Sequence, residues 1–392
     1  MFKFQICTFG TMITINSKLP NVATNIFTVM SQLALENNAI NLSQGFPDFE
    51  CPPELMDLVN NYMRSGHNQY APMPGVMALR EKIADKINLI HGANYNPDTE
   101  ITVTAGGTQA IFTALMAVIH PNDEVIIFEP AYDCYAPAIK LMGGIVKGFE
   151  LSAPDYLIDW NLLKKMVNNQ TRLIILNSPQ NPTGKILSAD DIAQLTRLVQ
   201  NTDILILSDE VYEHIIFDGE THHSVARYPL LRERSFIVAS FGKLFHNTGW
   251  KIGYCAAPAW LMKEFRKVHQ FLIFSVNTPF QYALADFLSN ELSYLSLNNF
   301  YQQKRDLFRD LMRDTRFDLL PCQGSYFQCV QYKRIGDEPD LEFSKRLITE
   351  YGVAGIPVSA FYNRGKDEQV IRFCFAKKQE TLEKAVERLK KI

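Results

Sequence analysis

Lys243 lies four residues after the apolar run FIVA (236–239), within the segment SFGKLFHNTGWKIGY. The run predicts a buried strand, and a lysine so close to its end is costly unless its charge is used or removed. Burial or a neighbouring cation lowers the pKa of a lysine from its ordinary value near ~10.4, which makes the amine a better base at neutral pH. Lys243 is therefore a candidate for covalent or proton-transfer chemistry, and the alternative is a surface lysine beside a turn.

The segment TAGGTQA places Gly106, Gly107 and Thr108 where a helix is expected to begin. Backbone N–H groups at a helix N-terminus and the helix dipole bind phosphate, so this turn is a candidate phosphate site. Ser240 and Lys251 can add a hydroxyl group and a positive charge to it. An ordinary tight turn is the alternative. The segment is not the G-x-G-x-x-G pattern of dinucleotide-binding folds, so it does not support nicotinamide binding.

Asp209 follows the apolar run ILIL, and Asn181 lies in the segment NSPQNPTG, which follows the apolar run RLIIL. A carboxylate at the end of a buried strand needs a cation or hydrogen-bond donors as partners. A protonated heteroaromatic nitrogen would serve, and helix capping is the alternative explanation of Asp209. Proline and glycine make NSPQNPTG a turn on either interpretation, from which the Asn181 amide can point at a ligand.

Together these features match one cofactor, pyridoxal 5'-phosphate. It carries a phosphate group, a basic ring nitrogen that pairs with an acidic residue, and an electrophilic carbon that an enzyme lysine holds as a Schiff base. Considered together with Asn181, Asp209 and Ser240, Lys243 is better explained as the attachment point of this cofactor than as a surface lysine.

The elements that must position these residues are short apolar runs that alternate with helical periods. The runs EITVT, EVIIF, RLIIL, DILIL and SFIVAS predict strands, and helix-like segments such as SADDIAQLTRLVQ separate several of them. This alternation predicts a mainly parallel sheet covered by helices on both faces. Ligands bind beyond the carboxyl ends of the strands in such sheets, where the candidate residues lie. Pro74 is expected to open a further helix, which ends at Gly92.

The character of the sequence changes near residue 290. Long polar helices are expected there, followed by strands at SYFQCVQY and VIRFCFA. The chain closes with a helix in which Leu382, Ala385, Val386 and Leu389 form one apolar stripe. This pattern predicts a separate, smaller α+β region.

Composition argues against several classes of protein. The chain has 392 residues, 47% of them hydrophobic, and a formal charge of −3, which favours two domains around a large core over a nucleic-acid-binding or membrane-surface protein. No apolar run approaches the ~20 residues of a membrane span. The start of the chain lacks a signal-peptide pattern, and Met12 is an alternative first residue.

Cysteine and histidine usage points to a location and argues against a metal. Seven scattered cysteines, Cys7 among them, show no Cys-x-x-Cys spacing, which predicts free thiols in a reducing cytoplasm. The histidines show no metal-ligand spacing either, so no metal site is expected. His222 and His223 lie in a polar stretch that is expected to be a surface loop.

Several motifs in one order resemble a known family from about Pro20 to the C-terminus. They are NLSQGFPDF, QYAPMPG, TAGGTQA, FEPAYDCY, NSPQNPTG, SDEVY, SFGKLFHNTGWKIGY and VIRFCFA. They resemble the class I/II aminotransferases of the fold-type I pyridoxal-phosphate enzymes. The segments FGKLFHNTGWKIGY and VHQFLIFSVNTP are most similar to the methionine aminotransferase and kynurenine aminotransferase (glutamine transaminase K) branch.

The resemblance implies an α/β fold of two domains. A large cofactor-binding domain, with a mainly parallel sheet covered by helices, is expected over residues 46–289. A smaller α+β domain is expected from both termini, with residues 1–45 as an N-terminal arm and part of that domain, and residues 290–392 as the rest of it. The working unit is expected to be a homodimer with shared active sites.

The resemblance also implies a role for each site residue. Lys243 would form the Schiff base, Asp209 would pair with the ring nitrogen, Asn181 and Tyr212 would bond the phenolic oxygen, and Tyr132 would stack on the ring. The expected phosphate ligands are Gly106, Gly107, Thr108, Ser240 and Lys251, with Tyr70 of the partner subunit. Many relatives have arginine in place of Lys251, and a lysine supplies charge but no bidentate fork.

The implied reaction is amino-group transfer from a large neutral amino acid to a 2-oxo acid by a ping-pong Schiff-base mechanism. Arg372 would bind the substrate carboxylate, helped by Asn181 and the Gly45 backbone, and no motif places a second arginine for a second carboxylate. Lys243 would transfer the Cα proton, with Asp209 and Tyr212 as the other catalytic residues. Methionine, aromatic amino acids, kynurenine and glutamine fit a pocket whose expected apolar lining is Phe27, Phe46, Tyr132 and Phe274 of the partner subunit.

Three other functions are weighed against this one. A cysteine-conjugate β-lyase on the same fold would use the same residues and is the nearest alternative. A ligand-sensing regulator would need a DNA-binding region, and about 20 residues before Pro20 are too few for a helix-turn-helix. A dinucleotide-dependent dehydrogenase would need the glycine pattern that is absent.

Overall fold

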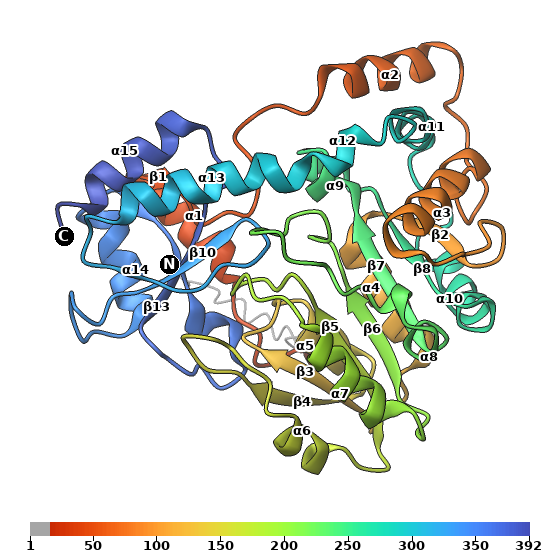
Figure 1. Ribbon diagram of the computed structural model, residues 1–392, viewed down its shortest axis with the longest axis horizontal. Helices are drawn as coiled ribbons and strands as arrows, with labels where there is room; N and C mark the ends of the chain where they lie inside the picture. The colour runs from red at the N-terminus through yellow and green to blue at the C-terminus, as the bar shows by residue number, and fades with distance from the viewer. Residues whose placement is uncertain (1–15) are drawn as a thin grey trace, which may run out of the picture.

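The computed structural model describes residues 16–392, so the expectations for Cys7 and for Met12 as the first residue lie outside the described range. Seven strands form the larger sheet, in the order β2-β8-β7-β6-β5-β3-β4 (Figure 1). They are β2 (Ile101–Thr104), β3 (Glu124–Glu129), β4 (Ile145–Glu150), β5 (Thr171–Asn177), β6 (Leu205–Asp209), β7 (Ser235–Ser240) and β8 (Gly253–Ala256). Neighbouring strands are parallel except where β8 pairs antiparallel with β2 and β7.

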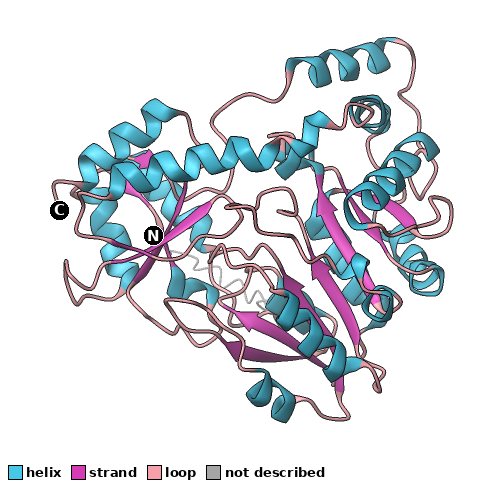
Figure 2. Ribbon diagram, viewed as in Figure 1, coloured by secondary structure: helices cyan, strands magenta, loops and turns pink. Residues whose placement is uncertain are grey.

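Helices cover both faces of this sheet (Figure 2). The helices around it are α2 (Pro53–Arg64), α3 (Met77–His91), α4 (Gly106–Val118), α5 (Tyr135–Leu141), α6 (Trp160–Met166), α7 (Ala189–Val199), α8 (Pro229–Arg232), α9 (Phe241–Leu244), α10 (Ala259–Leu272) and α11 (Thr278–Phe287). Side chains alternate between the faces. In β3, Val125 and Ile127 join the apolar cluster of α4, α5 and α10, whereas Ile126 joins the cluster that includes α3, α6 and α7. Burial on both faces explains the continuous apolar runs of the sequence.

The sequence prediction of this sheet is confirmed for five strands and incomplete for two. Strand β4 has largely half-exposed residues and contains Lys147 and Gly148, so it lacks an apolar run. Strand β8 has only four residues. The helix expected to open at Pro74 begins at Met77, because Gly75 has φ +101° and cannot be helical. Gly92 ends this helix in the left-handed conformation, as predicted.

The smaller part of the molecule contains the expected strands and C-terminal helix. Its antiparallel sheet has the order β12-β13-β10-β9, and β1 pairs parallel with β11. The strands are β1 (Ile40–Asn41), β9 (Asp318–Leu319), β10 (Phe327–Gln331), β11 (Val353–Ala354), β12 (Ile356–Pro357) and β13 (Val370–Cys374), and the helices are α1 (Ile26–Glu36), α12 (Leu292–Leu295), α13 (Leu297–Met312), α14 (Asp340–Thr349) and α15 (Gln379–Leu389). The predicted apolar stripe of α15 is buried.

The N-terminal segment packs on the C-terminal one. Ile40 of β1 pairs with Val353 of β11, and Met30 and Ala34 of α1 lie in one apolar cluster with Ile348 of α14. This pairing agrees with a smaller domain drawn from both ends of the chain, and the boundaries at residues 45 and 289 stay a prediction. Between residues 16 and 392, no helix combines the length and the apolar character that crossing a membrane requires.

Candidate active site

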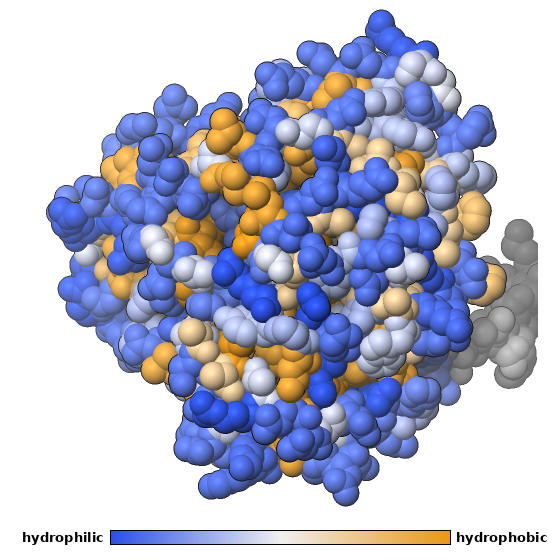
Figure 3. All heavy atoms as spheres, turned by 45° about the vertical axis from the view of Figure 1, so that its right-hand side comes forward, coloured by the Kyte–Doolittle hydropathy of each residue, from blue (hydrophilic) through white to orange (hydrophobic). Residues whose placement is uncertain are grey.

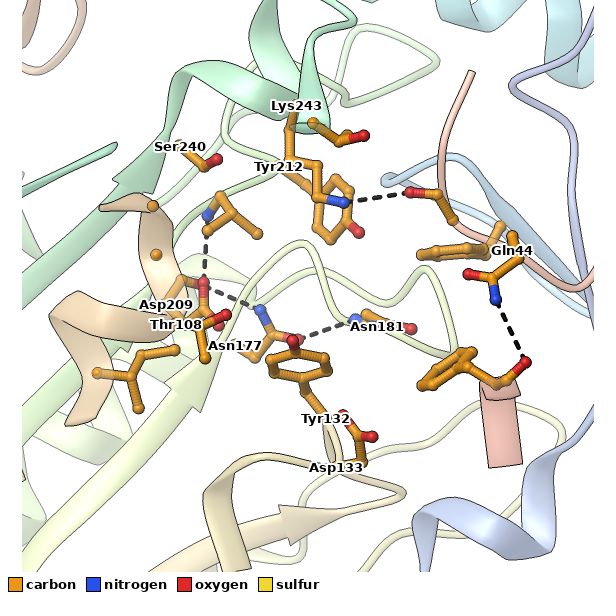
Figure 4. A pocket seen from close by; sticks show the side chains of 18 of the residues that line it. Gln44, Thr108, Tyr132, Asp133, Asn177, Asn181, Asp209, Tyr212, Ser240 and Lys243 are labelled. Atoms are coloured by element: carbon orange, nitrogen blue, oxygen red, sulfur yellow. Dashed lines mark hydrogen bonds between the residues drawn. The ribbon is translucent and has the colours of Figure 1, made fainter. Parts of the chain in front are cut away.

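A cavity of about 380 Å³ lies where β5, β6 and β7 end and α4 begins, with Phe27 of α1 and Arg372 of β13 on its opposite side. The carboxyl ends of parallel strands meet at one edge of a sheet, which brings together segments far apart in the sequence. Apart from Tyr70, Phe274 and Phe46, the predicted site residues line this cavity: Phe27, Gly45, Gly106, Gly107, Thr108, Tyr132, Asn181, Asp209, Tyr212, Ser240, Lys243, Lys251 and Arg372. Figure 4 shows several of them around the open space.

Lys243 enters the cavity from the short helix α9, which directly follows β7. Its Nζ donates a hydrogen bond to the carbonyl oxygen of Gly45 at 3.2 Å and lies 5.6 Å from the centre of the Tyr326 ring. Burial, aided by the charges of Lys251 and Arg372, lowers the pKa of Lys243 to about 8. About one amine in ten is then neutral at pH 7, against fewer than about one in a thousand for an ordinary lysine.

Asp209 is the last residue of β6 and is 3% exposed. The Tyr135 hydroxyl donates to its Oδ2 at 2.6 Å, and the Val211 N–H donates to its Oδ1 at 3.3 Å. Burial raises the pKa of Asp209 to about 6, and the hydrogen bond from Tyr135 opposes this rise. A turn follows Asp209 rather than a helix, so helix capping does not explain it. A protonated nitrogen in the cavity would stabilise the ionised form of this carboxylate, which burial disfavours.

The glycine turn disfavours side chains, through its left-handed backbone at Gly106 and through close packing at Gly107. Gly106 has φ +77°, and a Cβ built on it would lie 3.4 Å from Nζ of Lys251. A Cβ on Gly107 would lie 3.1 Å from Val211. Backbone N–H groups at the start of α4 are thereby left open toward the cavity, beside Lys251. This arrangement suits an anion.

Arg372 lies opposite the glycine turn with its guanidinium group buried. It donates to Oδ1 of Asn181 and to the carbonyl oxygen of Ser43, both at 2.7 Å, so its recorded partners are neutral. Its Nε is buried without a hydrogen-bond partner, and the Phe327 ring lies 3.9 Å from its Cζ. Burial lowers the pKa of Arg372. A carboxylate in the cavity would be a charge partner for this buried cation.

Several pocket residues were not singled out from the sequence. Asn177 donates to the carbonyl oxygen of Asp209 at 3.0 Å and accepts from the N–H of Asn181 at 2.8 Å, so it ties two strand ends together. Asn177 and Tyr135 belong to the motifs NSPQNPTG and FEPAYDCY, which carried the signal without showing which side chain faces which. Asp133 and Gln44 also line the cavity.

Tyr70 and Phe274 lie outside the cavity. Tyr70 is 83% exposed, and its ring meets that of Phe274 edge to face at 5.4 Å. Phe46, expected in the pocket lining, is also exposed and lies over Lys377 instead. The expectation that Tyr70 and Phe274 serve a neighbouring subunit stays a prediction.

A buried charged cluster lies behind Lys243. Lys86 donates to Glu213 at 2.6 Å, His91 lies 3.3 Å from Glu213, and His222 lies 2.8 Å from Glu210. The expected surface location of His222 is therefore wrong, because Glu210 is buried and needs a polar partner there. His91, Glu210 and His222 each have an atom that could ligate a metal, and these atoms lie within 4.8 Å of one another. The spacing of these residues in the sequence did not predict this proximity. Each already has a partner within the protein.

Comparisons with known proteins place this geometry in a family. The family model described as Aminotransferase class I and II matches residues 37–389. The chain belongs to this family. It is 49% identical over 377 residues to the methionine aminotransferase of Escherichia coli, covering 96% of this chain and 98% of that one. It is 34% identical to the kynurenine–oxoglutarate transaminase of Dictyostelium discoideum, covering 94% of each chain.

A solved structure supports the same family assignment. An Escherichia coli protein whose structure and reactivity identify a methionine aminotransferase function superposes with a TM-score of 0.95 at 48% identity, covering 97% of this chain and 100% of that one. The chain is thus an aminotransferase with the fold of the fold-type I enzymes, and both sequence predictions are confirmed.

Proposed function

We propose that this aminotransferase uses pyridoxal 5'-phosphate to move the amino group of a large neutral amino acid to a 2-oxo acid in a ping-pong cycle. The observation that supports this most is the convergence of Lys243, Asp209 and the N-terminus of α4 in one cavity. Few small molecules need a nucleophilic amine, a carboxylate and a phosphate site together, and this cofactor does.

The residues present fit this cofactor. The closely packed Gly106 and Gly107 would let the backbone approach the phosphate, with Lys251 beside it. Asp209 would face the ring nitrogen, and Tyr132 would lie against the ring. Arg372 would bind the substrate carboxylate, because its recorded partners are neutral and its Nε is unpaired. When bound, the cofactor supplies an electron-accepting ring that stabilises the substrate carbanion.

The protein's own contribution is to hold and move protons. Lys243 Nζ would be the base that takes the Cα proton of the substrate and returns a proton later in the transfer. Its pKa of about 8 places it close to neutral pH, where such a base works best. Asp209 would hold a proton on the cofactor's ring nitrogen. The hydrogen bond from Tyr135 and the bond from Asn177 to the Asp209 carbonyl keep that carboxylate in place.

The preference for one carboxylate and a neutral side chain rests on the charges of the cavity wall. Lys251 lies at the glycine turn, which leaves Arg372 as the cation available to a substrate carboxylate among the described lining residues. Aromatic rings of Phe27, Tyr132 and Phe327 line the same space. The 49% identity to an enzyme named methionine aminotransferase supports the same class of substrate.

Single-turnover spectroscopy with a panel of amino acids tests this function. We expect the holoenzyme's absorption to change fully with methionine, phenylalanine, tyrosine, kynurenine or glutamine, and a 2-oxo acid to restore it. Release of one 2-oxo acid per site should accompany the change. Net production of pyruvate and ammonia from a cysteine conjugate, without amino-group transfer, would instead identify a β-lyase. An unchanged spectrum with every amino acid would contradict the proposal.

We also propose that the working unit is a homodimer with shared active sites. The support is an exposed apolar group formed by Tyr70, Phe271, Leu272, Ile273 and Phe274, which lies outside the cavity of its own chain. Figure 3 shows one face of the molecule, on which apolar side chains gather in a few patches among hydrophilic ones. Exposed large apolar side chains in a group are typical of protein interfaces.

Mixing two inactive proteins tests the shared site. One carries Lys243→Ala and the other carries Tyr70→Phe with Phe274→Ala. In a mixed two-fold dimer one site has all three changes and the other has none, so activity should rise toward about a quarter of wild type at equal mixing, because half of the dimers are mixed. Native mass spectrometry confirms the exchange. Exchange without any gain in activity would show that each chain completes its own site.

Two further features of the chain are proposals of the same kind. The division at residues 45 and 289 into an N-terminal arm, a large domain and a small domain is supported by the pairing of β1 with β11. A reducing, cytoplasmic location is supported by the six unpaired cysteines found among residues 16–392.

A further inference from the structure

The acidic and basic side chains that line the cavity are Asp133, Asp209, Lys243, Lys251 and Arg372. The proposed reaction uses all of them except Asp133. We propose that Asp133 determines specificity: its carboxylate excludes substrates with a second carboxylate and favours a side chain that carries an N–H donor. This inference rests on the proposed function and extends it to a residue that the reaction itself does not need.

The position of Asp133 supports this role. It directly follows Tyr132, and in Figure 4 it lies beyond that ring, on the side of the cavity away from Lys243. Asn25 Nδ2 donates to its Oδ2, while Asn25 Oδ1 accepts from the Phe27 N–H at 2.7 Å as the N-cap of α1. The start of α1 thereby fixes the carboxylate on the cavity wall. Beyond this bond and one from its own backbone N–H, the carboxylate has no further recorded hydrogen-bond partner within residues 16–392, so it can also accept from a ligand.

The negative charge of Asp133 would disfavour the binding of a substrate with a second carboxylate. Burial raises its pKa, and the hydrogen bond from Asn25 and the charge of Arg372 oppose that rise and favour the ionised form. With one substrate carboxylate at Arg372, a second one on the side chain would approach the Asp133 carboxylate. Like charges a few ångströms apart in a partly buried site disfavour binding by about 10- to 100-fold.

The same carboxylate is an acceptor for a neutral donor. The side-chain amide of glutamine and the aromatic amine of kynurenine carry N–H groups that can bond to Oδ1, whereas the thioether of methionine cannot. A hydrogen bond to a charged acceptor exceeds one to a neutral acceptor by about fivefold in binding. Asp133 therefore ranks the neutral substrates as well as rejecting the acidic ones.

Asp133→Asn tests both parts, because it removes the charge and keeps the shape. Calorimetry of the holoenzyme with two unreactive five-carbon acids, glutarate and valerate, gives a readout that does not depend on turnover. We expect glutarate to bind at least about tenfold tighter relative to valerate in the variant. In turnover, the kcat/KM ratio of glutamate to methionine should rise by a similar factor, and the ratio of glutamine to methionine should fall about fivefold.

Two controls keep the outcomes separate. Asp155→Asn changes the same charge at an exposed position outside the cavity and should leave every ratio at its wild-type value. Asp133→Ala removes the charge without an amide and must move the glutarate ratio in the same direction. If the ratios are unchanged in both Asp133 variants, the inference about specificity is wrong. The proposed function still stands in that case, provided that the protein transfers the amino group of methionine. Failure of the wild-type protein to transfer any amino group would overturn the function itself.

Discussion

Replacing Lys243 by alanine should abolish amino-group transfer while leaving the fold intact. The amine that would hold the cofactor and the base that would move the Cα proton are lost together, so the loss should reach about a millionfold, the size of the effect when a catalytic nucleophile or its base is removed. The surrounding structure should tolerate the change, because Nζ makes one recorded hydrogen bond, to the Gly45 carbonyl oxygen. Stopped-flow turnover with methionine, alongside thermal unfolding, measures both effects.

Three observations would bear on that result. Borohydride reduction of the holoenzyme followed by peptide mapping should find the cofactor on the peptide that contains Lys243. A label on Lys251 would reverse the assignment of the two lysines. Lys267→Ala, at an exposed position of α10, is the matched control and should keep wild-type turnover. Transamination by the Lys243 variant near the wild-type rate would contradict the mechanism.

Asp209→Asn should slow Cα deprotonation by about 100-fold or more while the cofactor stays partly bound. An asparagine can still accept the hydrogen bond that Tyr135 donates at 2.6 Å, so the packing should persist. What it lacks is the negative charge that would keep the ring nitrogen of the proposed cofactor protonated. Single-turnover rates with methionine measure the chemical step apart from cofactor binding.

Tyr135→Phe separates the charge of Asp209 from its placement. This variant removes the hydroxyl donor and keeps the carboxylate, whose pKa should rise further because the bond from Tyr135 opposes the effect of burial. We expect a loss of about tenfold, at the lower end of what removing one hydrogen bond to a charged group costs, because the carboxylate itself remains. Equal rates for Asp209→Asn and wild type would show that Asp209 only supports the structure.

The sequence by itself determined the parts of the site that lie next to strand ends. Gly106, Asp209 and Lys243 each follow an apolar run that becomes a strand buried on both faces. Parallel strands present their carboxyl ends at one edge, so recognising the runs was enough to bring these residues together. The local rules also gave the end of α3 at Gly92, because a left-handed residue there favours glycine.

Side-chain pairings across long stretches of chain were decided only by the tertiary structure. Arg372 bonds to Asn181, 191 residues away, and Tyr135 bonds to Asp209, 74 residues away. Asn25 bonds to Asp133 through the packing of α1 against the cavity. Local propensity contains no information on such contacts, because they depend on how separate elements dock.

The elements that the sequence missed have the same explanation. Strands β4 and β8 become strands because each pairs with an existing strand of the sheet, at an edge for β4 and between β2 and β7 for β8. His222, in a polar segment, is buried because Glu210 requires a partner. Apolar runs and turn residues can be recognised from a short stretch of sequence. An edge strand or a buried ion pair, in contrast, is stable only in the presence of its partner, which lies elsewhere in the chain.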